Sequence, residues 1–276
     1  MEKAVEGAIG KSVEESDYYR TFIGPGDKYD QFAAMQFNLL THLGLREGNT
    51  LLDVGCGSLR AGRLFIPYLL PEMYHGLEPV EWLINEGVKC QIGEDMVRIK
   101  KPVFSHDENF TLTVFQKKFD YIIAQSVFSH ATKEQIRRCL HEARQVMTPT
   151  TIFAATFAEG AEDYAGDKWA LWATYAMETI KELADEAGLV CRPLDWPHPD
   201  LQRWVLFVTQ DFEGTIPDLS GGENLMLVKK ESEFCKERLA KIENHPYVVI
   251  GFKISRLMRL VGFGINNAMR WFRCDK

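Results

Sequence analysis

The sequence lacks the features that mark several large protein classes. No window of about 18 residues is apolar and uncharged throughout, which excludes a membrane-spanning helix. The first 20 residues carry no basic start, no continuous apolar stretch and no small-residue cleavage site, so no export signal is predicted and a cytoplasmic protein is expected. Internal repeats and Gly/Ser-rich linkers are also absent, which argues against a repeat array.

Basic residues are outnumbered by acidic residues, 32 to 39, which gives a net charge of −7 at neutral pH. Binding to nucleic-acid phosphates depends on a surplus of Lys and Arg, so nucleic acid is not the expected partner and a small or neutral substrate is favoured. The six cysteines include no CxxC pair. We therefore predict reduced thiols and no metal site.

The sequence does contain enough apolar residues, 46% of 276, for a large core. Between residues 50 and 210, short β-rich runs alternate with helical stretches. This alternation predicts a mostly parallel sheet covered by helices. The β-rich runs are TLLDV, MYHGLE, PVFS, FDYIIAQ and TTIFAATF, and the helical stretches are SLRAGRLFIPYLL, VEWLINEGVKC, KEQIRRCLHEARQVM and KWALWATYAMETIKELADEAG.

Local signals set the limits of these elements. Thr132 and Gln135 have the spacing of a capping box at a helix start. After Gly188, the segment LVCRPLDWPHPDLQRWVLFVTQ reads as an antiparallel pair of strands at the sheet edge. Helices broken by the turn at 24–26 are expected before the first strand. The predicted parts are an N-terminal helical cap (1–48), an α/β domain (49–212) and a C-terminal helical extension (213–276).

The strongest local motif is a glycine turn that follows the first predicted strand. Asp53, Gly55 and Gly57 form a D-x-G-x-G pattern, and Glu78 closes the next strand. Glycines let a backbone approach a ligand closely, and a carboxylate after the second strand can accept both hydroxyls of a ribose. Arg60 stands where a dinucleotide fingerprint needs its third glycine, which weakens the interpretation as a nicotinamide-dependent oxidoreductase.

The D-x-G-x-G pattern resembles motif I of class I S-adenosylmethionine (SAM)-dependent methyltransferases. The longer string GCGSLRAGR, followed by YHGLEP, resembles a bacterial subgroup of these enzymes, and the resemblance spans residues 20–210. It implies a Rossmann-like, seven-stranded, mostly parallel α/β sheet with an antiparallel last strand and helices on both faces. It also implies a SAM cofactor over the carboxyl ends of the first two strands.

The resemblance assigns roles to individual residues. Gly55 and Gly57 would pass under the methionine part of SAM, Asp53 would bind its amino group, and Glu78 would hold its ribose. Ser58 and Arg60 would supply donors for the cofactor carboxylate. Two more cofactor-binding candidates lie after later strands. They are Asp107, for the adenine amine, and Gln125.

Methyl transfer mainly requires alignment, and a base helps when the acceptor is a hydroxyl. His130 and His198 are the candidate bases, because imidazole titrates near neutral pH, but each could also be a structural or solvated histidine. Four aromatic residues are candidates for lining the acceptor site, although aromatic side chains more often serve packing. They are Tyr164, Trp169, Trp172 and Trp196.

The motifs of several methyltransferase chemistries are missing after the fourth predicted strand. AQSVF replaces the [DN]-P-P-[YF] motif of exocyclic-amine methylation, no Pro-Cys nucleophile is present, and no acidic cluster indicates magnesium. Methylation of an oxygen or nitrogen on a small-molecule, glycan-like or lipid-linked acceptor remains. A protein that binds SAM as a sensor or scaffold, without turnover, is the alternative.

The C-terminal stretch differs in charge from the rest. Six basic residues and one acid between Val249 and Lys276 give it a net charge of +5, with apolar residues at helical spacing. It could bind the inner face of an anionic membrane peripherally, or pack on the body or across a homodimer. Two segments near the expected pocket rim, Gly24-Pro25-Gly26 and 160–166, are predicted to include one that orders on ligand binding.

Overall fold

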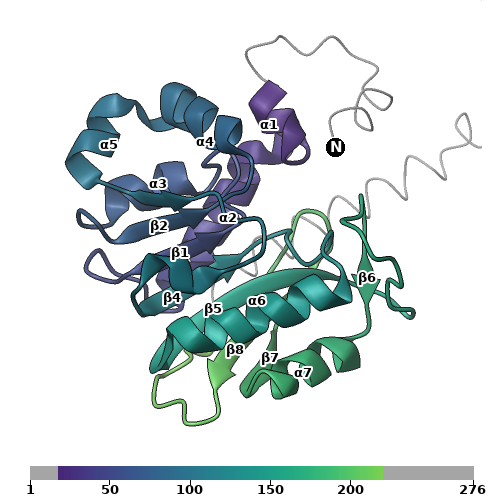
Figure 1. Ribbon diagram of the computed structural model, residues 1–276. Coiled ribbons are helices and arrows are strands. Elements are labelled where there is room, and N and C mark those ends of the chain that lie inside the picture. Colours follow the sequence, from purple (N-terminus) through teal and green to yellow (C-terminus); the bar gives the residue numbers. More distant parts are fainter. Residues whose placement is uncertain (1–17, 220–276) are drawn as a thin grey trace, which may run out of the picture. The chain divides into compact units, whose positions relative to one another are not determined.

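The central sheet has the strand order β3-β2-β1-β4-β5-β8-β7, and a short strand β6 pairs with β5 (Figure 1). The computed structural model describes residues 18–219. By its internal contacts the chain divides into two units, Met1–Ser220 and Gly221–Lys276. The strands are β1 (Leu51–Val54), β2 (Tyr74–Leu77), β3 (Val103–Ser105), β4 (Phe119–Ala124), β5 (Met147–Glu159), β6 (Thr174–Tyr175), β7 (Leu189–Leu194) and β8 (Arg203–Thr209).

Strands β1 to β5 run parallel in the sheet, and β8 runs antiparallel to both β5 and β7. This confirms the predicted Rossmann-like class with its reversed last strand. The sheet order reverses between β1 and β4, so the loops after these two strands lie side by side at one edge. Ligands of doubly wound sheets bind at such a switch point.

Helices cover both faces of the sheet (Figure 1). They are α1 (Tyr18–Phe22), α2 (Tyr29–His42), α3 (Gly62–Tyr68), α4 (Glu81–Gly87), α5 (Glu94–Lys100), α6 (Lys133–Val146) and α7 (Met177–Glu186). Alternate residues of β1 face opposite layers: Leu52 and Val54 belong to the apolar cluster that includes α6 and α7, and Leu51 belongs to the cluster that includes α2 and α3.

The capping box at the start of α6 is confirmed. The Thr132 side chain accepts from the backbone N–H of Gln135, and the Gln135 side chain accepts from the backbone N–H of Thr132. Each bond satisfies an amide that the first helical turn leaves without a backbone partner. The predicted helices before the first strand are present as α1 and α2, with a single 3-10 turn at Gly26–Lys28 between them.

The predicted helix over 168–188 is wrong in its first half, because α7 begins only at Met177. Residues 168–173 form a loop whose backbone hydrogen bonds go to a distant part of the chain. The N–H groups of Ala170 and Ala173 donate to the carbonyls of His130 and Ser129, at 2.8 and 2.7 Å. These long-range bonds replace the i to i+4 bonds of a helix, and β6 then pairs with β5.

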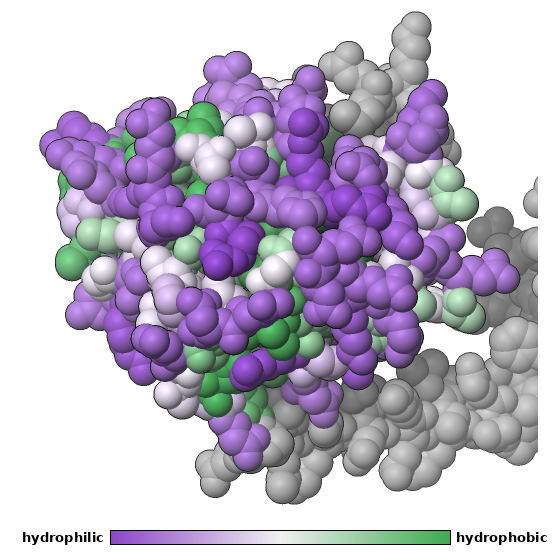
Figure 2. All heavy atoms as spheres, turned by 60° about the horizontal axis from the view of Figure 1, so that its bottom comes forward, coloured by the Kyte–Doolittle hydropathy of each residue, from purple (hydrophilic) through white to green (hydrophobic). Residues whose placement is uncertain are grey.

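Figure 2 shows a face covered mainly by hydrophilic residues, with hydrophobic atoms confined to small areas. Among residues 18–219, no helix is long and apolar enough to cross a membrane. The predicted basic tail at 249–276 lies outside the described residues.

Candidate functional site

The glycine turn after β1 has the backbone conformation that its sequence predicts. Gly55 and Gly57 have φ values of +72° and +54°, the left-handed region that favours glycine. A Cβ at Gly55 would lie 2.7 Å from Cγ2 of Val127, so this turn also touches the loop after β4. Gly55 is exposed and Gly57 is buried. The turn therefore brings bare backbone to the switch-point edge of the sheet.

Glu78 holds this turn from the neighbouring strand. The parallel register pairs Val54 with Leu77, and Glu78 follows at once. The backbone N–H of Gly57 donates to Glu78 Oε2 and that of Val80 donates to Oε1, both at 3.0 Å. Burial raises the pKa of this carboxyl, and the two backbone donors oppose the shift. Because each carboxylate oxygen has two lone pairs, Glu78 keeps one acceptor site on each oxygen for a ligand diol.

Asp53 lies within β1 and is almost fully buried. Its Oδ2 accepts from the hydroxyl of Tyr74 at 2.8 Å. Burial raises the pKa of Asp53 to about 6, against the effects of the Tyr74 hydrogen bond and the positive charge of Arg60. Asp53 can therefore change its charge near neutral pH, and a cationic ligand would favour its ionised form.

Arg60 is a buried cation without an ion pair among residues 18–219. Its Nη2 donates to Gln125 Oε1 at 2.5 Å and its Nη1 to the carbonyl of Ile23 at 3.2 Å. The guanidinium carbon lies 4.5 Å from the ring centroid of Phe32, a cation–π geometry. Burial lowers the pKa of Arg60 to about 10, so the group stays charged at neutral pH. The remaining N–H donors can bind an anion such as a carboxylate.

The N-terminal cap covers this part of the site. The hydroxyl of Tyr29 donates to the carbonyl of Ser58 at 3.0 Å, and the Ser58 hydroxyl donates to the carbonyl of Tyr19 at 3.1 Å. Lys28 forms an ion pair of 2.6 Å with Asp200 from the loop between β7 and β8. The predicted contact of Ser58 with the cofactor carboxylate stays a prediction, since its side chain here binds the cap.

Gln125 and His198, which sequence reasoning placed in different roles, meet in one network. Gln125 Nε2 lies 3.0 Å from His198 Nε2, and His198 Nδ1 lies 3.2 and 3.3 Å from the backbone nitrogens of Asp200 and Gln202. Burial lowers the pKa of His198 to about 4, so the ring is neutral. Since both ring nitrogens already contact protein nitrogens, the geometry favours a structural role. A catalytic role for His198 stays a prediction.

Sequence reasoning missed the residues that complete this network. Ser126 Oγ accepts from Gln125 Nε2 at 2.6 Å and from Gln202 Nε2 at 2.8 Å. Thr156 accepts from the backbone N–H of Ser126 and donates to Gln202 Oε1. The only signal in the sequence was the position of Ser126 after the fourth predicted strand, because Gln202 and Thr156 arrive from other strands.

Asp107 follows β3, next to the strand that carries Glu78. Its Oδ1 accepts from the backbone N–H groups of Asn109 and Thr111, both at 2.8 Å, which leaves Oδ2 for other contacts. The preceding His106 donates from Nδ1 to the carbonyl of Glu78 at 2.9 Å, a contact that sequence reasoning did not anticipate. The structure thus brings Asp107 to the same edge as Glu78, and the adenine contact stays a prediction.

His130 forms a separate cluster with two of the predicted aromatic residues. Its ring stacks on Trp169, with centroids 5.8 Å apart, and meets Trp172 edge-on at 6.4 Å. Its Nδ1 donates to the carbonyl of Ala170 at 3.0 Å. Burial lowers the pKa of His130, partly offset by backbone carbonyls. Trp196 lies elsewhere, 5.4 Å from the ring of His42, so the structure does not bring it to this cluster.

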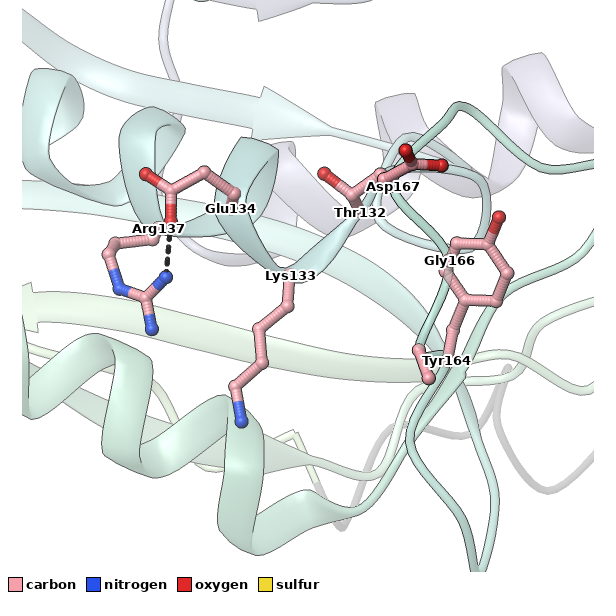
Figure 3. Close-up of a pocket in the computed structure, with 8 residues that line it drawn as sticks. Thr132, Lys133, Glu134, Arg137, Tyr164, Gly166 and Asp167 are labelled. Carbon is pink, nitrogen blue, oxygen red and sulfur yellow. Dashed lines mark hydrogen bonds and ion pairs between the residues drawn. The ribbon is translucent and has the colours of Figure 1, made fainter.

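Tyr164 lies at a surface pocket of about 510 Å³ at the start of α6 (Figure 3). Lys133 and Arg137 line it, but both are paired: Lys133 with Asp163, and Arg137 with Glu134 and Glu186. The pocket includes no residue of the glycine turn. Its cations are neutralised, so we assign no ligand to it.

Known proteins resemble this chain in fold rather than in sequence. No protein-family model and no curated protein matches the sequence. Solved structures with a similar fold include magnesium protoporphyrin IX methyltransferase (ChlM) from Synechocystis PCC 6803 with bound SAM. It has a TM-score of 0.53 and 16% identity, over 69% of this chain and 89% of that one.

Two further structures agree. A SAM-dependent methyltransferase from Leishmania major has a TM-score of 0.53 and 17% identity, over 70% of this chain and 80% of that one. DesVI from Streptomyces venezuelae has a TM-score of 0.51 and 17% identity, over 72% of this chain and all of that one. This chain therefore has the fold found in SAM-dependent methyltransferases.

Proposed function

We propose that the chain binds SAM at the switch-point edge of the sheet and transfers its methyl group to a small-molecule or glycan-like acceptor. The observation that carries the proposal is the contact of Glu78 with the glycine turn. It fixes a carboxylate between two backbone donors and keeps an acceptor site on each oxygen for the ribose diol. The fold shared with SAM-dependent methyltransferases supports the same ligand.

Three charged residues suit the ends of this cofactor. Arg60, a buried cation without an ion pair among the described residues, would bind the carboxylate. Asp53 would accept the ammonium group, and Asp107 the adenine amine. SAM supplies a methyl group on a positively charged sulfur, so the protein mainly has to align an acceptor atom with it and exclude water.

His130 is the base that we propose for a hydroxyl acceptor. Burial lowers the pKa of His130 and so favours the neutral ring, which can take up the proton that a hydroxyl loses on methylation. Trp169 and Trp172, which flank it, would contact the acceptor. His130→Gln should then slow transfer while leaving the affinity for S-adenosylhomocysteine (SAH) unchanged. Equal transfer rates for the wild type and His130→Gln would contradict the assignment of His130 as the base.

Calorimetry with SAM, SAH and NAD tests the cofactor. We expect SAM and SAH to bind and NAD not to bind. Glu78→Ala should weaken SAM binding, and Glu81→Ala, three residues later on the exposed surface of α4, should not. Binding of NAD, or equal SAM affinity in the two variants, would overturn the proposal.

Trideuteromethyl-labelled SAM identifies the acceptor. The protein is incubated with the labelled cofactor and a deproteinised cell extract, and mass spectrometry detects molecules that gain the label. We expect a labelled small molecule or glycan with the methyl group on oxygen or nitrogen. A protein that scaffolds or senses SAM is the second candidate, because the polar groups after β4 bind one another. SAM binding without any labelled product would favour it.

The proposed peripheral membrane contact and the homodimer depend on residues 249–276. This stretch has a net charge of +5. In sedimentation with anionic vesicles, the full chain should therefore be found in the vesicle pellet, and a chain that ends before Val249 should stay in the supernatant. Sedimentation velocity of the same two chains tests the dimer. A full-length chain that stays in the supernatant would exclude the membrane proposal.

A further inference from the structure

Ser126 occupies a strained position at the switch-point edge. It lies two residues after the end of β4, and its φ of +58° places a serine in the left-handed region. Such conformations cost free energy and often occur at binding sites. The next residue, Val127, touches the glycine turn at Gly55. Ser126 therefore belongs to the loop that meets the turn we propose for SAM.

Both lone pairs of this hydroxyl are used. Gln125 Nε2 donates to Ser126 Oγ at 2.6 Å and Gln202 Nε2 donates at 2.8 Å. A serine hydroxyl has two acceptor sites and one hydrogen. The hydrogen must therefore point away from both amides, and none of residues 18–219 accepts it. Because Ser126 is only half-buried, a ligand can reach it.

The orientation of the two amides is fixed by other residues. Arg60 has only donors, so the Gln125 atom 2.5 Å from its Nη2 is the oxygen and the other atom is the nitrogen. Thr156 Oγ1 accepts the backbone N–H of Ser126, and its own hydrogen goes to Gln202 Oε1. Turning Gln125 would place its amide nitrogen against the Arg60 guanidinium, and turning Gln202 would leave the hydrogen of the buried Thr156 hydroxyl without its acceptor.

The surroundings of Ser126 are rich in donors and poor in acids. Arg60 carries a buried positive charge with no ion pair among the described residues. Of the two carboxylates on this side of the sheet, Asp200 is paired with Lys28, and Asp53 is the one that we assign to the ammonium group of SAM. An ammonium group would find no free acceptor at Ser126, whereas an oxygen with lone pairs would complete its hydrogen bonding.

We propose that Ser126 is a substrate-binding residue whose hydroxyl donates to an oxygen of the methyl acceptor. The acceptor then carries a carboxylate, carbonyl or phenolate oxygen next to the atom that is methylated, and is not an alkylammonium compound. This inference rests on the proposed methyl transfer. It narrows the acceptor class from hydroxyl or amine compounds in general to those with such an oxygen.

Acetate and methylammonium are matched probes, similar in size and opposite in charge. Each is titrated into the full chain with SAH at saturation, and the side-chain amide signals of Gln125 and Gln202 are followed by NMR. Both amides donate to Ser126, so a ligand on its hydroxyl polarises them. We expect acetate to shift both signals and methylammonium to shift neither. No response to acetate, or an equal response to methylammonium, would overturn the inference.

Variants separate this role from folding. Ser126→Ala and Ser126→Gly both remove the hydroxyl, and glycine also relieves the positive φ. Both should lose the acetate response and keep their SAH affinity. Ser129→Ala is the control, because that buried hydroxyl on the same loop has no hydrogen-bond partner, and it should keep the response. An acetate response that persists without the Ser126 hydroxyl would contradict the assignment.

Transfer to the natural acceptor gives a second readout. In the labelled-extract assay, Ser126→Gly should lower incorporation about tenfold to a hundredfold, as expected for one hydrogen bond to a charged oxygen. Unchanged incorporation would overturn the inference but leave the proposed function intact. Failure of the wild-type protein to bind SAH would instead contradict the proposed function, and comparing the acetate responses of the free wild-type and Ser126→Gly proteins would still test Ser126.

Discussion

The backbone N–H of Gly57 donates to Glu78 Oε2 at 3.0 Å and joins the turn after β1 to the carboxylate after β2. The two residues are 21 positions apart in the chain, and the parallel pairing of their strands brings them together. The bond orders the carboxylate before any ligand arrives, so binding does not have to immobilise this side chain.

Glu78→Gln should weaken SAH binding while the fold is retained. The amide keeps one oxygen acceptor, but its NH₂ group would face either the N–H of Gly57 or that of Val80. Loss of a hydrogen bond to a charged group corresponds to about a tenfold to hundredfold weaker affinity, measured by calorimetry. Glu81→Gln is the exposed control on α4. An affinity for Glu78→Gln equal to that of the control would show that the ribose lies elsewhere.

Asp53 should make stability depend on pH. Burial raises its pKa from 3.8 to about 6, so the folded state holds a proton that the unfolded state releases between these values. The contribution of protonated Asp53 to the stability of the folded state is therefore fully present below about pH 4 and is lost as pH rises through 6. The free energy of unfolding of Asp53→Asn, measured with urea, should therefore rise relative to that of the wild type by up to about 3 kcal/mol between pH 4 and 7. A difference that does not change with pH would contradict this.

The ion pair between Lys28 and Asp200 should hold the N-terminal cap closed. Asp200→Ala removes the pair and keeps the tryptic sites at Arg20 and Lys28, so trypsin should cut there several times faster. SAH should slow the cleavage, if the segment at 24–26 orders on ligand binding. Asp95→Ala, which breaks an exposed pair with Arg98, is the control. Equal cleavage rates for both variants, with and without SAH, would contradict the prediction that this segment orders on ligand binding.

Thr132→Ala should destabilise the protein without changing the site. It removes the side chain that caps α6, at a cost of about 1 kcal/mol. For a chain of this size, that corresponds to a fall in Tm of about 2 to 4 °C in a thermal scan. The SAH affinity of the folded variant should match that of the wild type. A loss of affinity would mean that α6 contributes to the cofactor site.

Local sequence predicted much of the sheet but not the loop at 168–173. The run KWALWATYAMETIKELADEAG has helical spacing throughout, yet only Met177–Glu186 is helical. The backbone of Ala170 and Ala173 pairs with residues 129 and 130, some 40 positions away. Hydrophobic periodicity contains no information about such distant partners, so the error falls where tertiary bonds override a local preference.

Some residues of the candidate site could be located from the sequence, and others could not. The glycines, Asp53 and Glu78 could be located from sequence because their motif lies within two neighbouring strands. The partners of Arg60 and Ser126 could not, since Gln125 is 65 positions from Arg60 and Gln202 is 76 positions from Ser126. Trp196, one of the aromatic candidates for the acceptor site, lies beside His42, a neighbour 154 positions earlier that the sequence could not indicate.

The sequence by itself determined most of the order of strands and helices, the glycine turn and the acid after the next strand, because each of these features depends on residues close together in the chain. The tertiary structure decided which polar groups meet at the edge of the sheet. There, among the described residues, the loops after β1 and β4 and the start of β8 bring together a buried arginine without an ion pair and a serine whose hydrogen lacks an acceptor. Hydrogen bonds between side chains of distant strands depend on how the chain crosses over to bring those strands together, and a local pattern does not contain that information.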